Sequence, residues 1–136
     1  MNIRAAIPGS KDTTAKRANA ANWREILEKI GPEIERDGRD CDRTGDFVSV
    51  NLDKLQHHGF FALGVPAEFG GGGIDFAGMC GMLRLLGSYD GSTALALSMH
   101  THQVLIPDWK RRMMGAPTEG LLKRVAQEGV RLVSSG

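Results

Sequence analysis

The sequence has little cysteine, few aromatic residues and no long hydrophobic run. Its two cysteines, Cys41 and Cys80, stand far apart without a Cys-x-x-Cys pair, which argues against a disulfide framework and favours free thiols. The most apolar stretch, residues 94–106, is interrupted by polar side chains and is too short to span a bilayer. No apolar signal segment opens the chain. We therefore expect a cytoplasmic protein without membrane association.

A strong charge of either sign is also absent. The 136 residues include 17 basic and 16 acidic side chains, for a formal net charge of +1. No basic stripe suggests nucleic acid as a partner, and no acidic tail suggests a cationic one. The length suits one folded domain, and a hydrophobic fraction of 41% is ordinary for a soluble protein.

What the sequence does contain is helical periodicity, because apolar residues recur at three- and four-residue steps. We predict an all-α bundle of about five helices within a domain over residues 18–130. The predicted helices cover residues 18–35, 51–58, 74–89, 92–109 and 118–128.

Polar and glycine-rich stretches separate these helices. Residues 1–17 read as a mobile arm and residues 36–47 as a polar loop. The helix over 92–109 is apolar nearly all round in its first half, which predicts a central, buried element. At residues 131–136, Val and Leu alternate with polar residues, which predicts the start of a β-strand.

Four consecutive glycines, Gly70 to Gly73, raise the possibility of a phosphate-binding loop. The spacing fits neither Gly-x4-Gly-Lys-Ser/Thr nor Gly-x-Gly-x-x-Gly, so we interpret the run as a structural turn. His100 and His102 cannot chelate one metal ion together, because residues two apart on a helix point about 200° apart. We therefore predict no metal site, and the residue patterns alone identify no catalytic group.

Three separated motifs resemble one known family. They are "LQHHGFFALGVPAEFGGGGIDF", "LLGSYDGSTALALSMHTH" and "LLKRVAQEGVRLVSSG". In this order and spacing they resemble the N-terminal helical domain of acyl-CoA dehydrogenases, over about residues 20–136. In that family the glycine segment is a turn into a helix. Ala67, Leu85 and Ser88 depart from the family's usual residues.

The resemblance implies a flavoprotein of fatty acid metabolism that uses FAD to dehydrogenate acyl-CoA thioesters at the α,β position. Such enzymes add a middle β-domain and a C-terminal helical bundle, and the bundle carries the catalytic glutamate. We therefore expect this chain to be a fragment that lacks those two domains and is inactive alone. Its expected partners are the missing domains and the acyl-CoA substrate, and the complete enzyme is expected to be a homo-oligomer.

By motif alignment, the acyl pocket is lined by Ala94, Leu95, Ser98 and His102, which steps of three and four place on one side of a helix. The alignment puts Ser134, Ser135 and Gly136 near the first flavin contacts.

Two alternatives remain open at this stage. One is a fragment of a flavin monooxygenase with the same fold. The other is a non-enzymatic helical module, in which Trp23, Trp109 and the aliphatic helix faces form an interaction surface.

Overall fold

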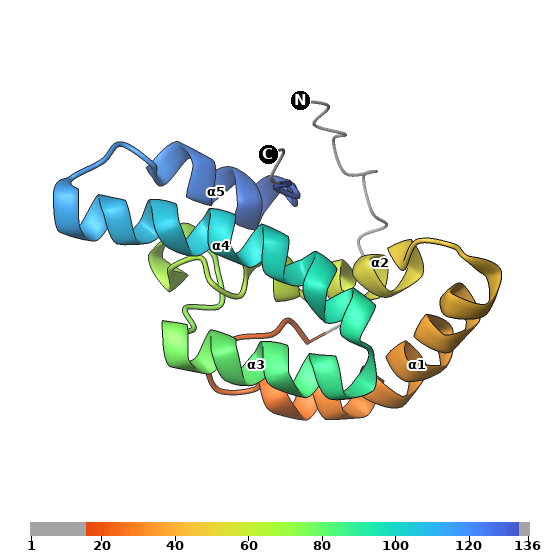
Figure 1. Ribbon diagram of the computed structural model, residues 1–136. Coiled ribbons are helices and arrows are strands. Elements are labelled where there is room, and N and C mark those ends of the chain that lie inside the picture. Colours follow the sequence, from red (N-terminus) through yellow and green to blue (C-terminus); the bar gives the residue numbers. More distant parts are fainter. Residues whose placement is uncertain (1–15, 134–136) are drawn as a thin grey trace.

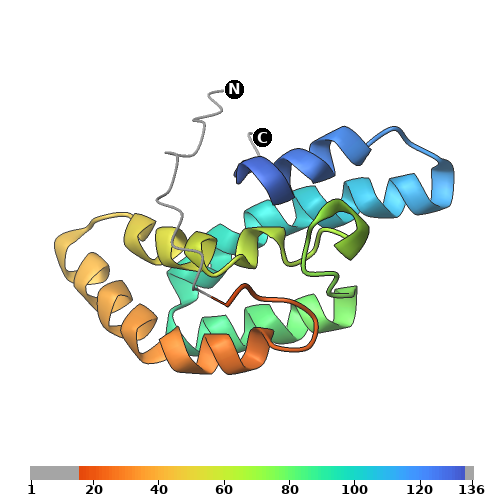
Figure 2. The ribbon, with the colours of Figure 1, turned by 180° about the vertical axis from the view of Figure 1, so that it is seen from behind.

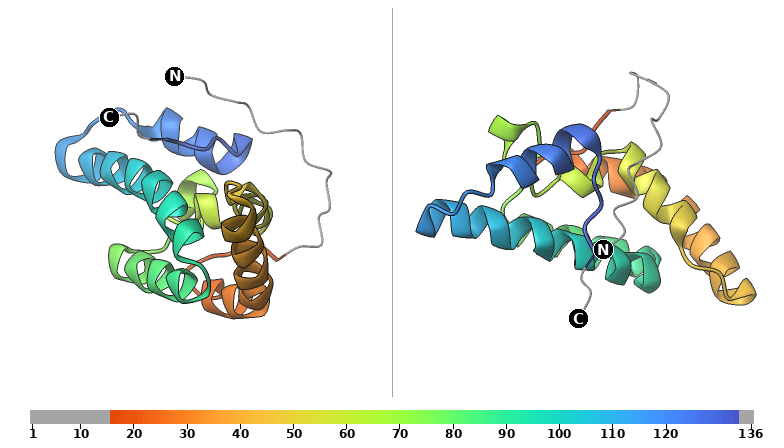
Figure 3. Two further views of the ribbon diagram at one scale, coloured as in Figure 1. Left: turned by 45° about the vertical axis from the view of Figure 1, so that its right-hand side comes forward. Right: turned by 90° about the horizontal axis from the view of Figure 1, so that it is seen from above.

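The computed structural model describes residues 16–133, and within them the fold is all-α, as predicted. The helices are α1 (Trp23–Thr44), α2 (Ser49–His57), η1 (Phe60–Ala62), η2 (Ala67–Phe69), α3 (Phe76–Tyr89), α4 (Gly91–Met114) and α5 (Glu119–Glu128). Figure 1 shows α4 running across the molecule with α3 on one side and α5 on the other, and the views in Figure 3 agree. The two single-turn 3₁₀ helices, η1 and η2, connect α2 to α3.

The first helix is longer than its pattern predicted. Residues 36–47 were expected to form a loop, but α1 continues to Thr44, so that prediction was wrong. Charged side chains one turn apart pair along the exposed surface, as Glu35 and Arg39 do, and such pairs support a helix. Pro32 lies inside α1, and Figure 2 shows the helix changing direction part-way along. A proline removes one backbone hydrogen bond, which permits such a bend.

The hydrophobic core has two parts. The larger part lies between α1, α2, η1, α3 and the first half of α4, and the smaller part lies beneath α5. The fully buried side chains of the larger part are those of Leu27, Ile34, Leu55, Phe60, Leu63, Met82, Leu86 and Leu97. The smaller part is built by Ala62, Val65, Phe69, Val104, Leu122, Val125 and Ala126.

The fourth helix is not the fully buried element that its composition predicted. Its inner side, with Leu97, His100 and Val104, packs into both parts of the core. Its other side carries large apolar residues that are exposed, including Leu95 and Trp109. The helix is therefore apolar on two opposite faces, and only one of them is covered.

The chain after α5 carries no regular secondary structure as far as residue 133. The rest of the strand predicted at 131–136 lies outside the described residues, as does nearly all of the arm predicted at 1–17.

Candidate functional site

The glycine run is a turn in which every glycine is required. Gly70 and Gly73 have φ angles of 90° and 67°, in the left-handed region that favours glycine. At Gly71, an added Cβ would lie 2.1 Å from the carbonyl oxygen of Val65. At Gly72, it would lie 2.8 Å from the Leu63 side chain. The run is thus fixed by backbone conformation at its ends and by close packing in its middle.

The same turn has no free amide for a phosphate. The N–H groups of the four glycines donate to backbone carbonyls of the preceding segment, at 2.9–3.2 Å. A phosphate loop depends on several backbone N–H groups that point at the ligand. The acceptors are the carbonyl oxygens of Ala62, Val65, Pro66 and Ala67.

A buried polar network sets where α4 begins. The Asp90 carboxylate accepts hydrogen bonds from the backbone N–H of Thr93, at 2.9 Å, and from its hydroxyl, and so caps the helix. The fully buried Asn51 amide donates to the Thr93 hydroxyl and to the Ile34 carbonyl, both at 3.0 Å. Gly38 leaves room for the Asp90 carboxyl, because a Cβ added at residue 38 would lie 2.5 Å from the Asp90 carboxyl carbon. The network joins α1, α2 and α4, and thereby positions the exposed face of α4.

The two histidines of α4 point to opposite sides, as the spacing predicted. His100 is buried, with its Nε2 2.7 Å from the Phe61 carbonyl oxygen and its Nδ1 accepting from the Leu132 N–H at 3.0 Å. These contacts require a neutral ring with the proton on Nε2. Burial lowers the pKa of His100 to about 4, which keeps the ring neutral. His100 is therefore a structural residue, and His102 is exposed.

Arg131 holds the same C-terminal segment from the other side. Its guanidinium donates to Gln56 at 2.9 Å and to Asp53 at 2.7 Å, and lies 4.9 Å from the centre of the Phe61 ring. The chain that follows α5 is thus attached to both α2 and α4.

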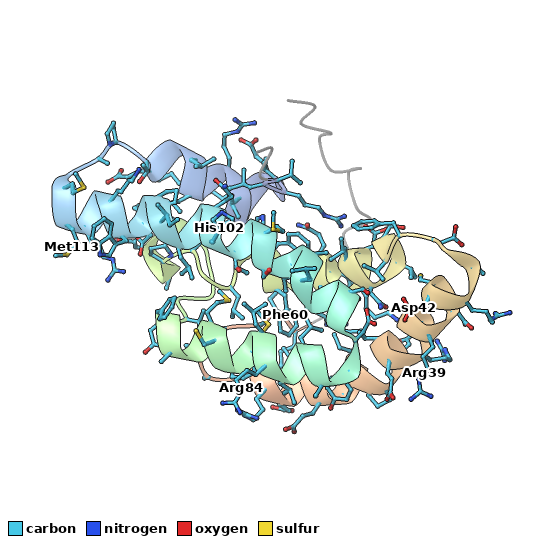
Figure 4. All side chains as sticks on the ribbon, in the orientation of Figure 1. Arg39, Asp42, Phe60, Arg84, His102 and Met113 are labelled. Carbon is cyan, nitrogen blue, oxygen red and sulfur yellow. The ribbon has the colours of Figure 1, made fainter. Side chains whose placement is uncertain are left out.

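The exposed face of α4 is a continuous stripe directly opposite its buried side. We call the exposed residues of this face the outer stripe. They are Leu95, Met99, His102, Ile106, Trp109 and Met113. Leu95 is 67% and Trp109 52% exposed. The stripe follows the long helix, on which His102 and Met113 are labelled in Figure 4.

The four residues predicted to line an acyl pocket lie at the N-terminal half of this face. Leu95 and His102 are exposed members of the outer stripe, and Ala94 and Ser98 lie half-buried beside it. The Ser98 hydroxyl donates to the Leu95 carbonyl at 2.6 Å, so its hydrogen is not available to a ligand. Sequence reasoning did not single out Met99, Ile106 or Met113. It did name Trp109 for a possible interaction surface, and Trp109 is exposed, whereas Trp23, named with it, is buried. The alternating steps of four and three from Leu95 to Met113 are a signal that could have found the other three.

The family model described as "Acyl-CoA dehydrogenase, N-terminal domain" matches residues 13–128. The chain belongs to the acyl-CoA dehydrogenase family. The matched region is that family's N-terminal domain, and it contains all five α-helices, the glycine turn and the outer stripe.

A curated relative supports the same assignment. The Bacillus subtilis (strain 168) protein named "Putative acyl-CoA dehydrogenase YdbM" is 33% identical over 78 residues, which cover 57% of this chain and 20% of the relative. The chain therefore spans about a fifth of the length of that acyl-CoA dehydrogenase relative. No solved structure gives a significant match to the chain.

Among residues 16–133, no three His, Cys, Asp or Glu side chains gather as metal ligands would. None of the helices in that range combines the length and the apolar character that a membrane span requires. The flavin contacts predicted at Ser134, Ser135 and Gly136 lie outside the described residues.

Proposed function

We propose that the chain is the N-terminal domain of an FAD-dependent oxidoreductase that dehydrogenates acyl-CoA thioesters at the α,β position. In this proposal the N-terminal half of the outer stripe forms one wall of the pocket that holds the acyl chain. The observation that carries it is the bare, largely apolar face of α4 at Ala94, Leu95, Ser98 and His102, in a chain that belongs to the acyl-CoA dehydrogenase family.

The geometry of this face suits a wall for an alkyl chain. Small side chains at Ala94 and Ser98 leave a shallow surface beside the exposed Leu95, and the Ser98 hydroxyl is satisfied within the helix. Burying apolar surface against an acyl chain gains about 0.8 kcal/mol for each methylene group. The buried network at Asp90 and Thr93 keeps the start of α4 fixed, which holds the wall in place.

Neither the glycine turn nor the outer stripe fits the pyrophosphate of FAD. The glycine turn has no amide free for a pyrophosphate, and the outer stripe carries no cationic or amide side chain for one. The stripe also carries no carboxylate that could act as a base. We therefore propose that this domain shapes the acyl pocket, that Ser134 to Gly136 lead to the flavin, and that the domain alone does not catalyse dehydrogenation. Both cysteines are free thiols, which suits the cytoplasm.

A paired substitution tests the acyl wall. Leu95→Asp puts a charge into the proposed apolar wall and should weaken octanoyl-CoA binding at least tenfold, measured by isothermal titration calorimetry. Val50→Asp is the matched control, because Val50 is also an exposed aliphatic residue but lies on α2. We expect the control to bind like the unmodified chain. Equal affinities for the two variants would contradict the proposed wall.

A further inference from the structure

The chain stays anchored to the helices for several residues beyond α5, although these residues form no regular secondary structure. We call residues 129–133 the exit segment. Its first anchor is the Gly129 carbonyl, which accepts a hydrogen bond from the Gln56 side-chain amide at 3.4 Å. The next residue, Val130, is buried. Val133 is 62% exposed, so the anchored path ends just before it.

Two side chains hold the middle of the exit segment, and both contact Phe61. The Arg131 guanidinium, which donates to α2, lies 4.9 Å from the centre of the Phe61 ring. His100 accepts the Leu132 N–H at 3.0 Å, and its ring centre lies 4.7 Å from that of Phe61. The anchor on α2 and the anchor on α4 are therefore joined through one buried aromatic ring.

The exit segment can be released without unfolding the helices that hold it. Its anchors are side chains of α2 and α4, and both helices pack into the larger part of the core through other residues. Release would leave the buried Nδ1 of His100 without a donor, which is costly. The hydrogen bond from Leu132 is thus the main lock, and the contacts of Arg131 with Gln56, Asp53 and Phe61 reinforce it.

The same turns of α4 carry the proposed acyl wall on their other side. His100 lies between Ser98 and His102 in the sequence, and its ring is buried whereas His102 is exposed. The helix therefore holds the exit segment on one side and presents the wall on the opposite side. Because both sides belong to one helix, a fixed exit segment also has a fixed position relative to the wall.

We propose that His100 and Arg131 are positioning residues, which latch the exit segment onto α4 and α2 and so fix where the chain leaves the domain relative to the acyl wall. The consequence for catalysis rests on the proposed function. In that proposal residues 134–136 lead to the flavin, and the latch gives them a fixed starting point behind the helix that bears the wall. The latch itself does not depend on acyl-CoA.

Amide hydrogen exchange of the whole ¹⁵N-labelled chain at pH 7.5 tests the latch. We expect the Leu132 N–H to be protected, yet to exchange faster than the core Leu97 N–H, because the segment opens locally. Arg131→Ala should speed Leu132 exchange at least about fivefold and lower its heteronuclear NOE, with Leu97 unchanged. Arg124→Ala is the matched control, because Arg124 pairs with Glu128 within α5 at 3.2 Å, and it should change neither amide.

Two replacements of His100 separate the hydrogen bond from the packing of the ring. The side-chain oxygen of asparagine stands as many bonds from Cα as Nδ1 does, and the side-chain nitrogen of glutamine as many as Nε2 does. We therefore expect His100→Asn to keep an acceptor for Leu132 and His100→Gln to lose it. Relative to Leu97, Leu132 should exchange at least about tenfold faster in His100→Gln than in His100→Asn. A role in packing alone would affect the two variants alike.

Three results would overturn the proposal. One is a Leu132 N–H that exchanges as fast as an unfolded amide in the unmodified chain. The second is parallel exchange of Leu132 and Leu97 in every variant, and the third is an Arg131→Ala variant that behaves like Arg124→Ala. The Arg131 side chain is 35% exposed, so its removal spares the core and carries the test even where the His100 variants fail to fold. No acyl-CoA is used, so failure of the latch and failure of the acyl wall are distinguishable.

Discussion

Gly71→Ala should destabilise the domain by more than about 3 kcal/mol, because the new methyl group would lie 2.1 Å from the Val65 carbonyl oxygen. That oxygen cannot retreat freely, since it accepts the hydrogen bond from the Gly73 N–H at 3.0 Å. Thermal melts followed by circular dichroism should show a midpoint lowered by roughly 10 °C or more.

Gly120→Ala is the matched control for that substitution. Gly120 lies in the first turn of α5, and an added Cβ meets nothing within 4 Å. Because alanine favours helices over glycine by up to about 1 kcal/mol, this variant should melt at or above the temperature of the unmodified chain. Gly71→Ala with an unchanged midpoint would mean that the turn is loose, contrary to the packing described above.

Stability should fall steeply as the pH drops from 6.5 to 4, because His100 must stay neutral in the folded state. Its pKa is lowered from 6.5 to about 4, so below pH 6.5 the unfolded chain binds a proton that the folded chain excludes. The stabilisation is fully present above pH 6.5. At pH 4.5 about 2–3 kcal/mol of it should be lost, as measured by urea unfolding at several pH values.

Two variants isolate this contribution from other groups that titrate in the same range. His100→Gln should be less stable than the unmodified chain at pH 7.5, because the Phe61 and Leu132 contacts are disturbed, but should lose about 2–3 kcal/mol less on going to pH 4.5. His102→Gln changes an exposed ring and should keep the original pH dependence. If His100→Gln and the unmodified chain lost stability in parallel, burial of a neutral His100 would not be the cause.

The sequence predicted the fold well where local patterns decide the structure. Five helices appear near the expected positions. Gly59 lies just beyond the C-terminal end of α2 and has a φ of 79°, the left-handed conformation that glycine commonly adopts after a helix. The error at residues 36–47 has a tertiary cause. Lys54 of α2 hydrogen-bonds to Asp37 at 3.0 Å and lowers the pKa of that carboxyl, and this contact holds the second half of α1 against α2. The composition of residues 36–47 is polar, and composition alone therefore predicts a loop there.

The candidate site was harder to predict, because burial is decided by neighbours distant in sequence. The apolar pattern of α4 does not say which of its two faces the other helices cover. His100 could not be told from His102 as the buried ring, since its partners are backbone groups of Phe61 and Leu132, which are 39 and 32 residues away. The resemblance to a family supplied the four acyl-wall positions, and their role stays a proposal.

The most direct test of the acyl wall is a chemical-shift map of the ¹⁵N-labelled chain during titration with octanoyl-CoA. We expect the largest shifts to fall within residues 94–102, and we expect the exposed Phe47 and Val50, which lie before α2 and on it, to stay still. Shifts centred on the glycine turn at 70–73, or none at millimolar ligand, would contradict the claim that α4 forms a wall of the acyl pocket.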